Sequence, residues 1–528
     1  MLRIIYIWAL SVPLTAWAGD THRYTVYLDN TLTSLRVEAR FDRPVTSVRA
    51  ASADASRYLR SATECDRQES LRVSGKRLSV RSGGIRCLSY SVDLAAAADD
   101  DRRNSVLSAQ NIVVSPRTWL WRPSLANGNS IELTFDVPDT LQVSVPWVET
   151  ASNVYRLSAS PGSGSAISAF GNFTSVSRDV GDTRLRIALL KAQSDYDYDA
   201  FADWLEATAQ NIMYAYGRFP YPEPQVVVVP VGGSGWNSNS PVPYGRVLRD
   251  GGEAVELFVN QHVPIDEFYD DWIATHEFSH LMLPYVTIRQ RWVSEGFAQY
   301  YQNVLLARAG IYDEQTAWQK IYEGLERGRR SGPGLSPNDS SRGNRRVALM
   351  KMYWSGAAIA LKADVELRRR SGGVETLDSV LGKLQACCLP SDRVWQAMEL
   401  FEQLDALIDE PVFLPLYRRY ADTPGFPPYD ELLDRLGIRE ARTGVTLSDS
   451  ATWSDVRRAI TGAPTNTTSS HSSPSSFSFP CSPEAAAPCL HRASVPPASV
   501  QTSETGQKSP PGPQRPRATA TAAPRPAT

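Results

Sequence analysis

The pattern His276-Glu277-Phe278-Ser279-His280 constrains the fold of this chain more than any other feature of its sequence. Two histidines four residues apart project from one face of a helix, so a helix here lets both reach a single metal ion. The alternative is a pair of histidines that packs or is solvated on an ordinary surface helix. We expect a helix from about Asp266 to Pro284, because the residue before a proline resists helical geometry.

A third metal ligand is expected on a second helix, which the sequence predicts from Trp292 through Ala309. Glu295 in Trp292-Val293-Ser294-Glu295-Gly296 is the candidate, and 14 residues separate it from His280. Two histidines and one carboxylate leave a fourth tetrahedral position for water, which is the arrangement of catalytic zinc. The alternative for Glu295 is a favourable charge at a helix N-terminus. Asp270 and Asp271 are expected to be solvated.

Glu277 lies between the two histidines and cannot easily reach the same ion. Its position suits a general base, which takes a proton from zinc-bound water and passes it to the leaving amine. The sequence therefore predicts Zn²⁺ held by His276, His280 and Glu295, with Glu277 as the base. The alternative for Glu277 is an ordinary surface carboxylate.

Length, apolar content and net charge limit the number of domains and the classes of partner that we expect. A chain of 528 residues exceeds one ordinary domain, and a 42% apolar share can bury full cores. The formal net charge is −2, which indicates neither a nucleic-acid partner nor a polybasic membrane contact. The sequence does not indicate an oligomeric state.

The N-terminus reads as a secretory signal peptide over residues 1–18. Arg3 precedes an apolar run from Ile4 that ends in Ala16-Trp17-Ala18, a small-x-small cleavage pattern. The alternative is a membrane anchor, but the run is shorter than the roughly 20 residues that span a bilayer. We expect a periplasmic or secreted protein without a transmembrane anchor in the mature chain.

Six cysteines in such a compartment can form disulfides. Cys65 and Cys87 lie on neighbouring predicted strands and form the preferred bridge. The pairing of Cys387, Cys388, Cys481 and Cys489 stays open. None of the six has zinc-knuckle spacing, so no cysteine metal site is expected.

The pattern of apolar residues divides the chain into a multidomain α+β architecture. Residues 19–191 alternate apolar and polar side chains and predict a β-sandwich of short antiparallel strands. Residues 192–372 form the predicted catalytic domain, with a helix over 195–216, a buried strand over 225–231, a loop over 232–243, a strand over 254–259 and a helix over 347–370. Residues 373–462 are predicted to be helical, and the Ser-, Thr-, Pro- and Ala-rich residues 463–528 to be disordered.

The two helical motifs together resemble the gluzincin metallopeptidases, and most closely the glycyl aminopeptidase family and its peptidase-MA-like relatives. The stretches from Tyr353 to Arg368 and from Phe413 to Tyr420 are similar to the later helices of that family. The resemblance covers about residues 20–445. It implies a thermolysin-like catalytic domain, the zinc ligands and base named above, and Tyr353 as a donor to the tetrahedral intermediate. From the sequence alone, Tyr353 could instead be a buried aromatic residue.

The chain departs from that family after the strand at 225–231. It has no Gly-x-Met-Glu-Asn or Gly-Gly-Leu-Glu-His segment, the elements that line the cleft in those enzymes. Gly235-Trp236-Asn237 and residues 251–256 occupy the region, so Glu253 and Glu256 are the candidates for binding a substrate amine. Strand-edge charges are the alternative for both. The expected function is a zinc metallopeptidase acting on peptides, with an aminopeptidase as one candidate type, and the alternative is an inactive relative that binds peptides or partners.

Overall fold

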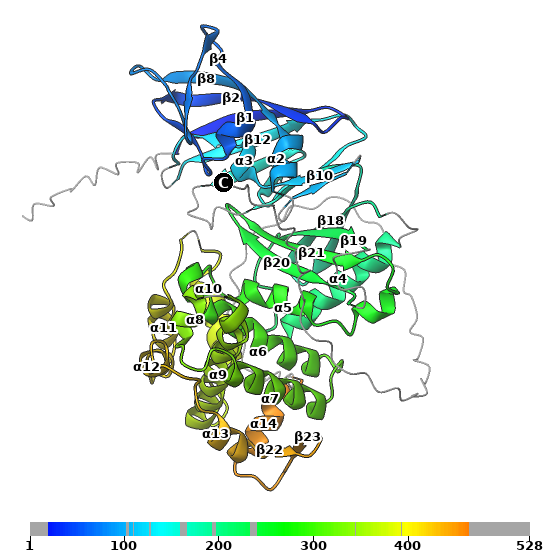
Figure 1. The fold of residues 1–528 in the computed structure, drawn as a ribbon, viewed down its shortest axis with the longest axis vertical. Coiled ribbons are helices and arrows are strands. Elements are labelled where there is room, and N and C mark those ends of the chain that lie inside the picture. The colour runs from blue at the N-terminus through cyan, green and yellow to red at the C-terminus, as the bar shows by residue number, and fades with distance from the viewer. Residues whose placement is uncertain are drawn as a thin grey trace, which may run out of the picture. The chain divides into compact units, whose positions relative to one another are not determined.

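The protein is described from a computed structural model (Figure 1), which describes residues 19–463 apart from 102–104, 109, 126–127, 159–165, 193–196, 233–239, 344 and 392. The predicted signal peptide lies outside these residues. So do nearly all of the predicted tail, with Cys481 and Cys489, and the Gly235-Trp236-Asn237 stretch.

The N-terminal part is β-rich, and its largest sheet has eight strands. They are β1 (Thr21–Leu28), β2 (Ser34–Val45), β4 (Leu59–Glu64), β5 (Glu69–Ser70), β8 (Ile85–Asp93), β12 (Ser130–Asp136), β14 (Val148–Ala151) and β15 (Val154–Ser158). Their order is β14-β15-β12-β1-β2-β8-β4-β5. Side-chain alternation explains the core: Tyr24, Val26 and Leu28 of β1 all point inward. The strands were expected to be antiparallel, but β1 pairs with β12 in parallel.

Two smaller sheets complete this part. One consists of β9 (Val106–Leu107), β10 (Asn111–Val114), β13 (Gln142–Ser144) and β16 (Ser168–Gly171). The other consists of β3 (Val48–Ala50), β6 (Val73–Ser74), β7 (Arg77–Leu78) and β11 (Trp121–Arg122), and three short helices join them: α1 (Ala55–Tyr58), α2 (Leu94–Asp100) and α3 (Pro116–Trp119). Cys65 and Cys87 form a disulfide with a Cα–Cα distance of 5.3 Å, and Cys387 is joined to Cys388.

A five-stranded sheet lies at the centre of the chain. Its strands are β17 (Thr174–Val180), β18 (Thr183–Leu189), β19 (Gln225–Val231), β20 (Tyr244–Arg249) and β21 (Glu253–Asn260), in the order β17-β18-β19-β21-β20. The valines of β19 are buried on both faces: Val226 and Val228 face the helical core, and Val227 and Val229 face a core shared with β10 and β16. The sequence placed β17 and β18 with the preceding β region, because alternation shows that a strand exists and not which sheet it joins.

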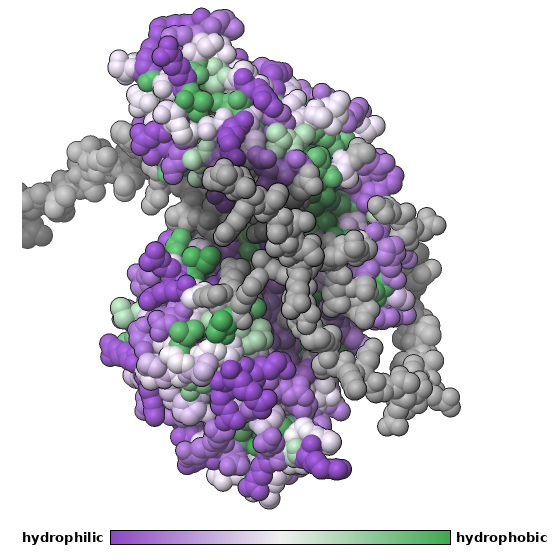
Figure 2. Space-filling view, in the orientation of Figure 1, coloured by the Kyte–Doolittle hydropathy of each residue, from purple (hydrophilic) through white to green (hydrophobic). Residues whose placement is uncertain are grey.

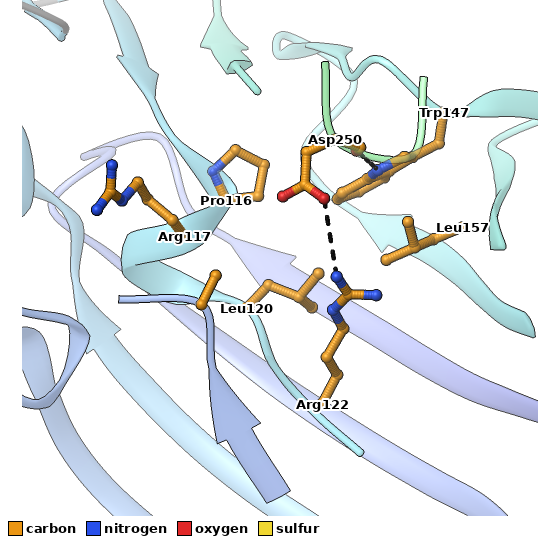
Figure 3. A pocket seen from close by; sticks show the side chains of 8 residues that line it. Pro116, Arg117, Leu120, Arg122, Trp147, Leu157 and Asp250 are labelled. Atoms are coloured by element: carbon orange, nitrogen blue, oxygen red, sulfur yellow. Dashed lines mark hydrogen bonds and ion pairs between the residues drawn. The ribbon is translucent and has the colours of Figure 1, made fainter. Parts of the chain in front are cut away.

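Strand β20 was not predicted from the sequence, which read as a loop up to Pro243. It is the edge strand of the sheet and runs antiparallel to β21. Its turn at Asp250 is fixed by residues of the β-rich part: Arg122 lies 3.8 Å from the Asp250 carboxylate, and the Trp147 indole donates a 3.2 Å hydrogen bond to the Asp250 carbonyl (Figure 3).

Helices cover the sheet and make up most of the rest of the described chain (Figure 1). Those of the central part are α4 (Tyr198–Met213), η1 (Ile265–Phe268), α5 (Ile273–Ser279), η2 (His280–Met282), η3 (Ile288–Gln290), α6 (Trp292–Arg308), α7 (Glu314–Arg330), α8 (Pro337–Arg342) and α9 (Arg345–Ser371). They are followed by α10 (Leu377–Cys388), α11 (Ala397–Asp405), α12 (Phe413–Tyr420), α13 (Asp430–Leu436), the hairpin of β22 (Ile438–Ala441) and β23 (Gly444–Leu447), and α14 (Ser454–Thr461).

The mixed α+β class, with a β-rich N-terminal part and a helical C-terminal part, is confirmed. Figure 2 shows a mostly hydrophilic surface on the visible face of the C-terminal helices, as expected where their apolar faces are packed inward. Across the residues that the structure describes, none of the helices combines the length and the hydrophobicity needed to cross a membrane.

Helices α6 and α9 cross very closely, and two glycines permit it. A Cβ on Gly296 would lie 2.2 Å from the Gly356 Cα, and a Cβ on Gly356 would lie 1.9 Å from the Trp292 carbonyl oxygen. Any side chain at either position would force the helices apart. This contact brings Glu295, one residue before Gly296, and Tyr353, one turn before Gly356, to the same place.

Candidate metal centre and catalytic cavity

The helix that carries the two histidines is shorter than expected. α5 begins at Ile273, not near Asp266, and its last turn tightens into the 3₁₀ helix η2 at His280. Asp271 explains the start: its carboxylate accepts a 2.7 Å hydrogen bond from the Ile273 N–H, so it serves the helix terminus instead of being merely solvated as predicted. Arg249 of β20 donates a 2.8 Å hydrogen bond to the His280 carbonyl at the other end.

His276, His280 and Glu295 converge, with one potential ligand atom from each lying within 4.8 Å of the others. Glu295 Oε2 lies 3.5 Å from Nε2 of each histidine. In tetrahedral zinc with bonds of about 2.1 Å, ligand atoms lie about 3.4 Å apart, so the donor set and its spacing fit zinc. It is the one cluster of this kind within the described part of the chain.

Neighbouring residues fix the orientation of these ligands. The Gln302 side-chain oxygen lies 2.8 Å from His276 Nδ1, which leaves Nε2 facing Glu295. Arg291 Nη2 donates a 2.9 Å hydrogen bond to Glu295 Oε1, so the two carboxylate oxygens have separate partners. Burial alone would raise the pKa of Glu295, but the hydrogen bonds from His276 and His280 hold it well below its usual range.

Glu277 lies beside this cluster, buried between α5 and β20. Its carboxyl lines the same cavity as His280 and Glu295. Burial raises the pKa of Glu277 to about 7, with the Glu295 charge acting in the same direction and His276 and Arg246 opposing it. A carboxyl group with such a pKa can both accept and return a proton near neutrality.

Gly245 of β20 makes room for Glu277. A Cβ at this position would lie 2.6 Å from Glu277 Cγ, closer than real Cβ contacts, and 3.1 Å from Leu257 Cδ2, which is tighter than most of them. Gly245→Ala is therefore expected to displace the Glu277 carboxyl and lower kcat/KM by about tenfold to a hundredfold, since a shift of about 1 Å can cost that much. Zinc content, measured by mass spectrometry, should stay at the wild-type value.

Gly83→Ala is the matched control, because a Cβ there meets nothing within 4 Å. It should leave both activity and zinc content unchanged. Full activity in Gly245→Ala would mean that Glu277 does not need its observed position.

Tyr353 of α9 also lies next to the cluster. Its ring centroid is 6.0 Å from that of His276, and it lines the cavity with Glu277 and Glu295. Burial and the Glu295 charge raise the pKa of Tyr353 well above its usual value, with Arg291 opposing them. The hydroxyl therefore stays protonated and can act as a hydrogen-bond donor.

The cavity has a volume of about 470 Å³. Its lining comes from β20, α5, η2, the connection to α6, α6 itself and α9: Tyr244, Gly245, Arg246, Val247, Leu248, Arg249, Glu277, His280, Tyr285, Val286, Ile288, Arg291, Ser294, Glu295, Leu349 and Tyr353. A peptide of a few residues fits such a volume.

Glu253 and Glu256 do not line this cavity. The Glu253 carboxylate forms a 2.6 Å ion pair with Arg249, and Glu256 pairs with Arg246 across the β20–β21 ladder. Glu256 is buried and the Glu253 side chain is 10% exposed, and each carboxylate neutralises an arginine that does line the cavity. The two glutamates that were expected to bind a substrate amine are therefore separated from the cavity by their arginine partners.

Arg291, Arg249 and Gln302 were missed by the sequence analysis. Arg291 is four residues before Glu295 and Gln302 is seven after it, so both share its helical face. With Glu295 taken as a ligand, that spacing could have predicted Arg291 and Gln302 as its neighbours. For Arg249 there was no local signal, because its partner carbonyl belongs to another element.

Comparison with known proteins supports the same reading. Residues 284–357 match the family model described as M61 glycyl aminopeptidase. The match includes Glu295 and Tyr353 and begins after His280. No curated protein matches the sequence.

Solved structures with a similar fold cover most of the chain. An aminopeptidase N family protein from Idiomarina loihiensis superposes with a TM-score of 0.58 at 16% identity, over 79% of this chain and 78% of that one. An M1 zinc metallopeptidase from Deinococcus radiodurans gives a TM-score of 0.50 at 12% identity, over 78% of this chain and 95% of that one. At these identities the likeness concerns the fold. Together with the family match, it confirms the resemblance drawn from the sequence: the chain is similar to zinc metallopeptidases and matches the M61 glycyl aminopeptidases over the segment that carries Glu295 and Tyr353.

Proposed function

We propose that the protein is a periplasmic or secreted zinc metallopeptidase that hydrolyses peptide bonds with His276, His280 and Glu295 as metal ligands. The observation that carries this proposal is the convergence of the three ligand atoms beside Glu277 and Tyr353 in one cavity. The predicted signal peptide and the Cys65–Cys87 disulfide support the compartment.

Zinc in this position would polarise the scissile carbonyl and make water acidic enough to lose a proton near neutral pH. Glu277 takes that proton and later delivers it to the leaving amine. Tyr353 donates a hydrogen bond to the oxygen on which negative charge develops. Arg291 keeps Glu295 oriented by holding its second oxygen.

Strand β20 supports a peptide as the substrate. It is the edge strand of its sheet, and all of its residues line the cavity. An extended peptide can add to such an edge through backbone hydrogen bonds, which hold the scissile bond without requiring one side chain. Action at the N-terminus of the peptide, as an aminopeptidase, follows from the family resemblance.

The test is cleavage of a mixed peptide library by the purified protein, with bound metal measured in the same sample. We expect about one zinc per chain. We also expect cleavage that a chelator abolishes and added Zn²⁺ restores. The cut positions distinguish removal of N-terminal residues from internal cleavage. Bound zinc with peptide binding and no cleavage would refute the proposal in favour of an inactive peptide-binding relative.

A further inference from the structure

A second hollow adjoins the catalytic cavity. Its volume is about 490 Å³, and it is lined by Ile288, Arg289, Arg291, Ser341, Arg342 and Gly343. Ile288 and Arg291 also line the catalytic cavity, so the two spaces share a wall. All the charged residues in this lining are arginines.

The connection between the two metal-binding helices and the C-terminal end of α8 together line this hollow. η3 in that connection packs against α8, and the Trp292 N–H donates a 3.1 Å hydrogen bond to the Ser341 hydroxyl. This contact places Arg342, the last residue of α8, in the same lining as Arg289. Ile288 adds an apolar surface that is 57% exposed.

The three arginines differ in what they already bind. Arg291 is engaged with Glu295, and its side chain is 20% exposed. Arg289 and Arg342 are exposed, and neither has an ion pair with a described residue. Two guanidinium groups beside an open space, with no carboxylate in the lining, favour an anionic ligand.

We propose that this hollow binds a carboxylate of the peptide substrate, so that the enzyme prefers peptides with Asp or Glu next to the scissile bond. This inference depends on the function proposed above. A peptide is favoured over other anions because the hollow opens beside the metal site, within reach of a neighbouring residue at about 3.3 Å per residue of extended chain. The net charge of −2 does not favour a long polyanion.

The sequence predicted an acidic site that binds a substrate amine, whereas the hollow beside the metal centre is basic. Glu253 and Glu256, the carboxylates expected to bind an amine, are paired with Arg249 and Arg246. The exposed charges in the hollow beside the metal centre, those of Arg289 and Arg342, are instead positive.

The test compares kcat/KM for peptide pairs that differ only in Asp against Asn, or Glu against Gln, at each position around the cut. We expect the wild type to prefer the acidic peptide by about fivefold to tenfold at one position, the size of two exposed ion pairs. The preference should weaken as salt rises. In Arg289→Gln/Arg342→Gln the ratio should fall to about one, and Arg289→Lys/Arg342→Lys should retain part of it.

Arg67→Gln/Arg72→Gln is the matched control, because it removes the same charge from exposed positions in the β-rich part. It should keep the wild-type ratio. An equal rate for acidic and amide peptides in the wild type, or a preference that survives in Arg289→Gln/Arg342→Gln, would overturn the inference.

Binding separates this inference from the proposed function. Fluorescence anisotropy of the same labelled peptide pair with the Glu277→Gln variant measures preference without cleavage. Tighter binding of the acidic peptide, lost in Arg289→Gln/Arg342→Gln, would support the hollow even if the wild type cleaved nothing. Cleavage of neutral peptides with no acidic preference in either assay would leave the peptidase and refute the hollow.

Discussion

Glu277→Gln is expected to lower kcat for peptide cleavage by about 10²–10⁴-fold, the range of a positioned general base. Gln has almost the same shape, so it fits against Gly245, but it cannot take a proton from water or return one to the amine. Among the described residues that line the cavity, the only other carboxylate is Glu295, which faces both histidines. No other carboxylate of this lining can therefore replace the lost base. Steady-state kinetics with zinc analysis of the same sample measures the effect.

Zinc content and peptide affinity should change little in this variant, because Glu277 is outside the set of three ligands. Glu267→Gln is the matched control: it makes the same change at an exposed position on η1, just before α5. Cleavage within tenfold of wild type in Glu277→Gln would assign the base to another residue.

The two histidines are the part of the site that sequence spacing determines most directly. A helix fixes the relation of His276 to His280 within one turn, and α5 with the first turn of η2 keeps it. Glu295 is less determined, because 14 residues between two ligands allow many paths. Its position depends on η3, on Trp292 bound to Ser341, and on the glycine contact between α6 and α9. These contacts join segments far apart in the chain, which no local pattern shows.

Strand β20 could not be predicted for a related reason. Its sequence, Tyr244 to Arg249, carries two arginines and a glycine, which do not read as a core strand. The arginines can be buried because Glu256 and Glu253 of β21 neutralise them in register. Each partner alone looks like a solvent-facing charge. The sequence predicted Glu253 and Glu256 as substrate ligands because their arginine partners on β20 could not be recognised from the sequence.

The predicted start of the helix that carries the two histidines was wrong, because a break at Asp271 separates η1 from α5. A continuous helix from Asp266 was expected, but η1 ends at Phe268 and Asp271 starts α5. α6 and α9 were predicted within two residues at each end, because both have long, uninterrupted helical sequences.

Tyr353→Phe is expected to lower kcat by about 10²–10³-fold, the cost of losing one donor to a developing oxyanion. The change removes a single oxygen and keeps the ring, so packing against His276 and the α6–α9 contact should persist. Because burial and Glu295 keep the hydroxyl protonated, its role is donation, and phenylalanine cannot donate. KM should change much less than kcat, since the bond matters most when the carbonyl oxygen becomes negative.

Zinc content distinguishes this role from a structural one. Tyr353 is not among the three converging ligands, so Tyr353→Phe should bind zinc as the wild type does and unfold at nearly the same temperature. Tyr269→Phe, at a tyrosine that is 39% exposed, is the control for the chemical change and should retain full activity. Equal turnover in Tyr353→Phe and wild type would leave Tyr353 as a buried aromatic residue, and stabilisation of the oxyanion would then have to come from the metal and from backbone donors of β20.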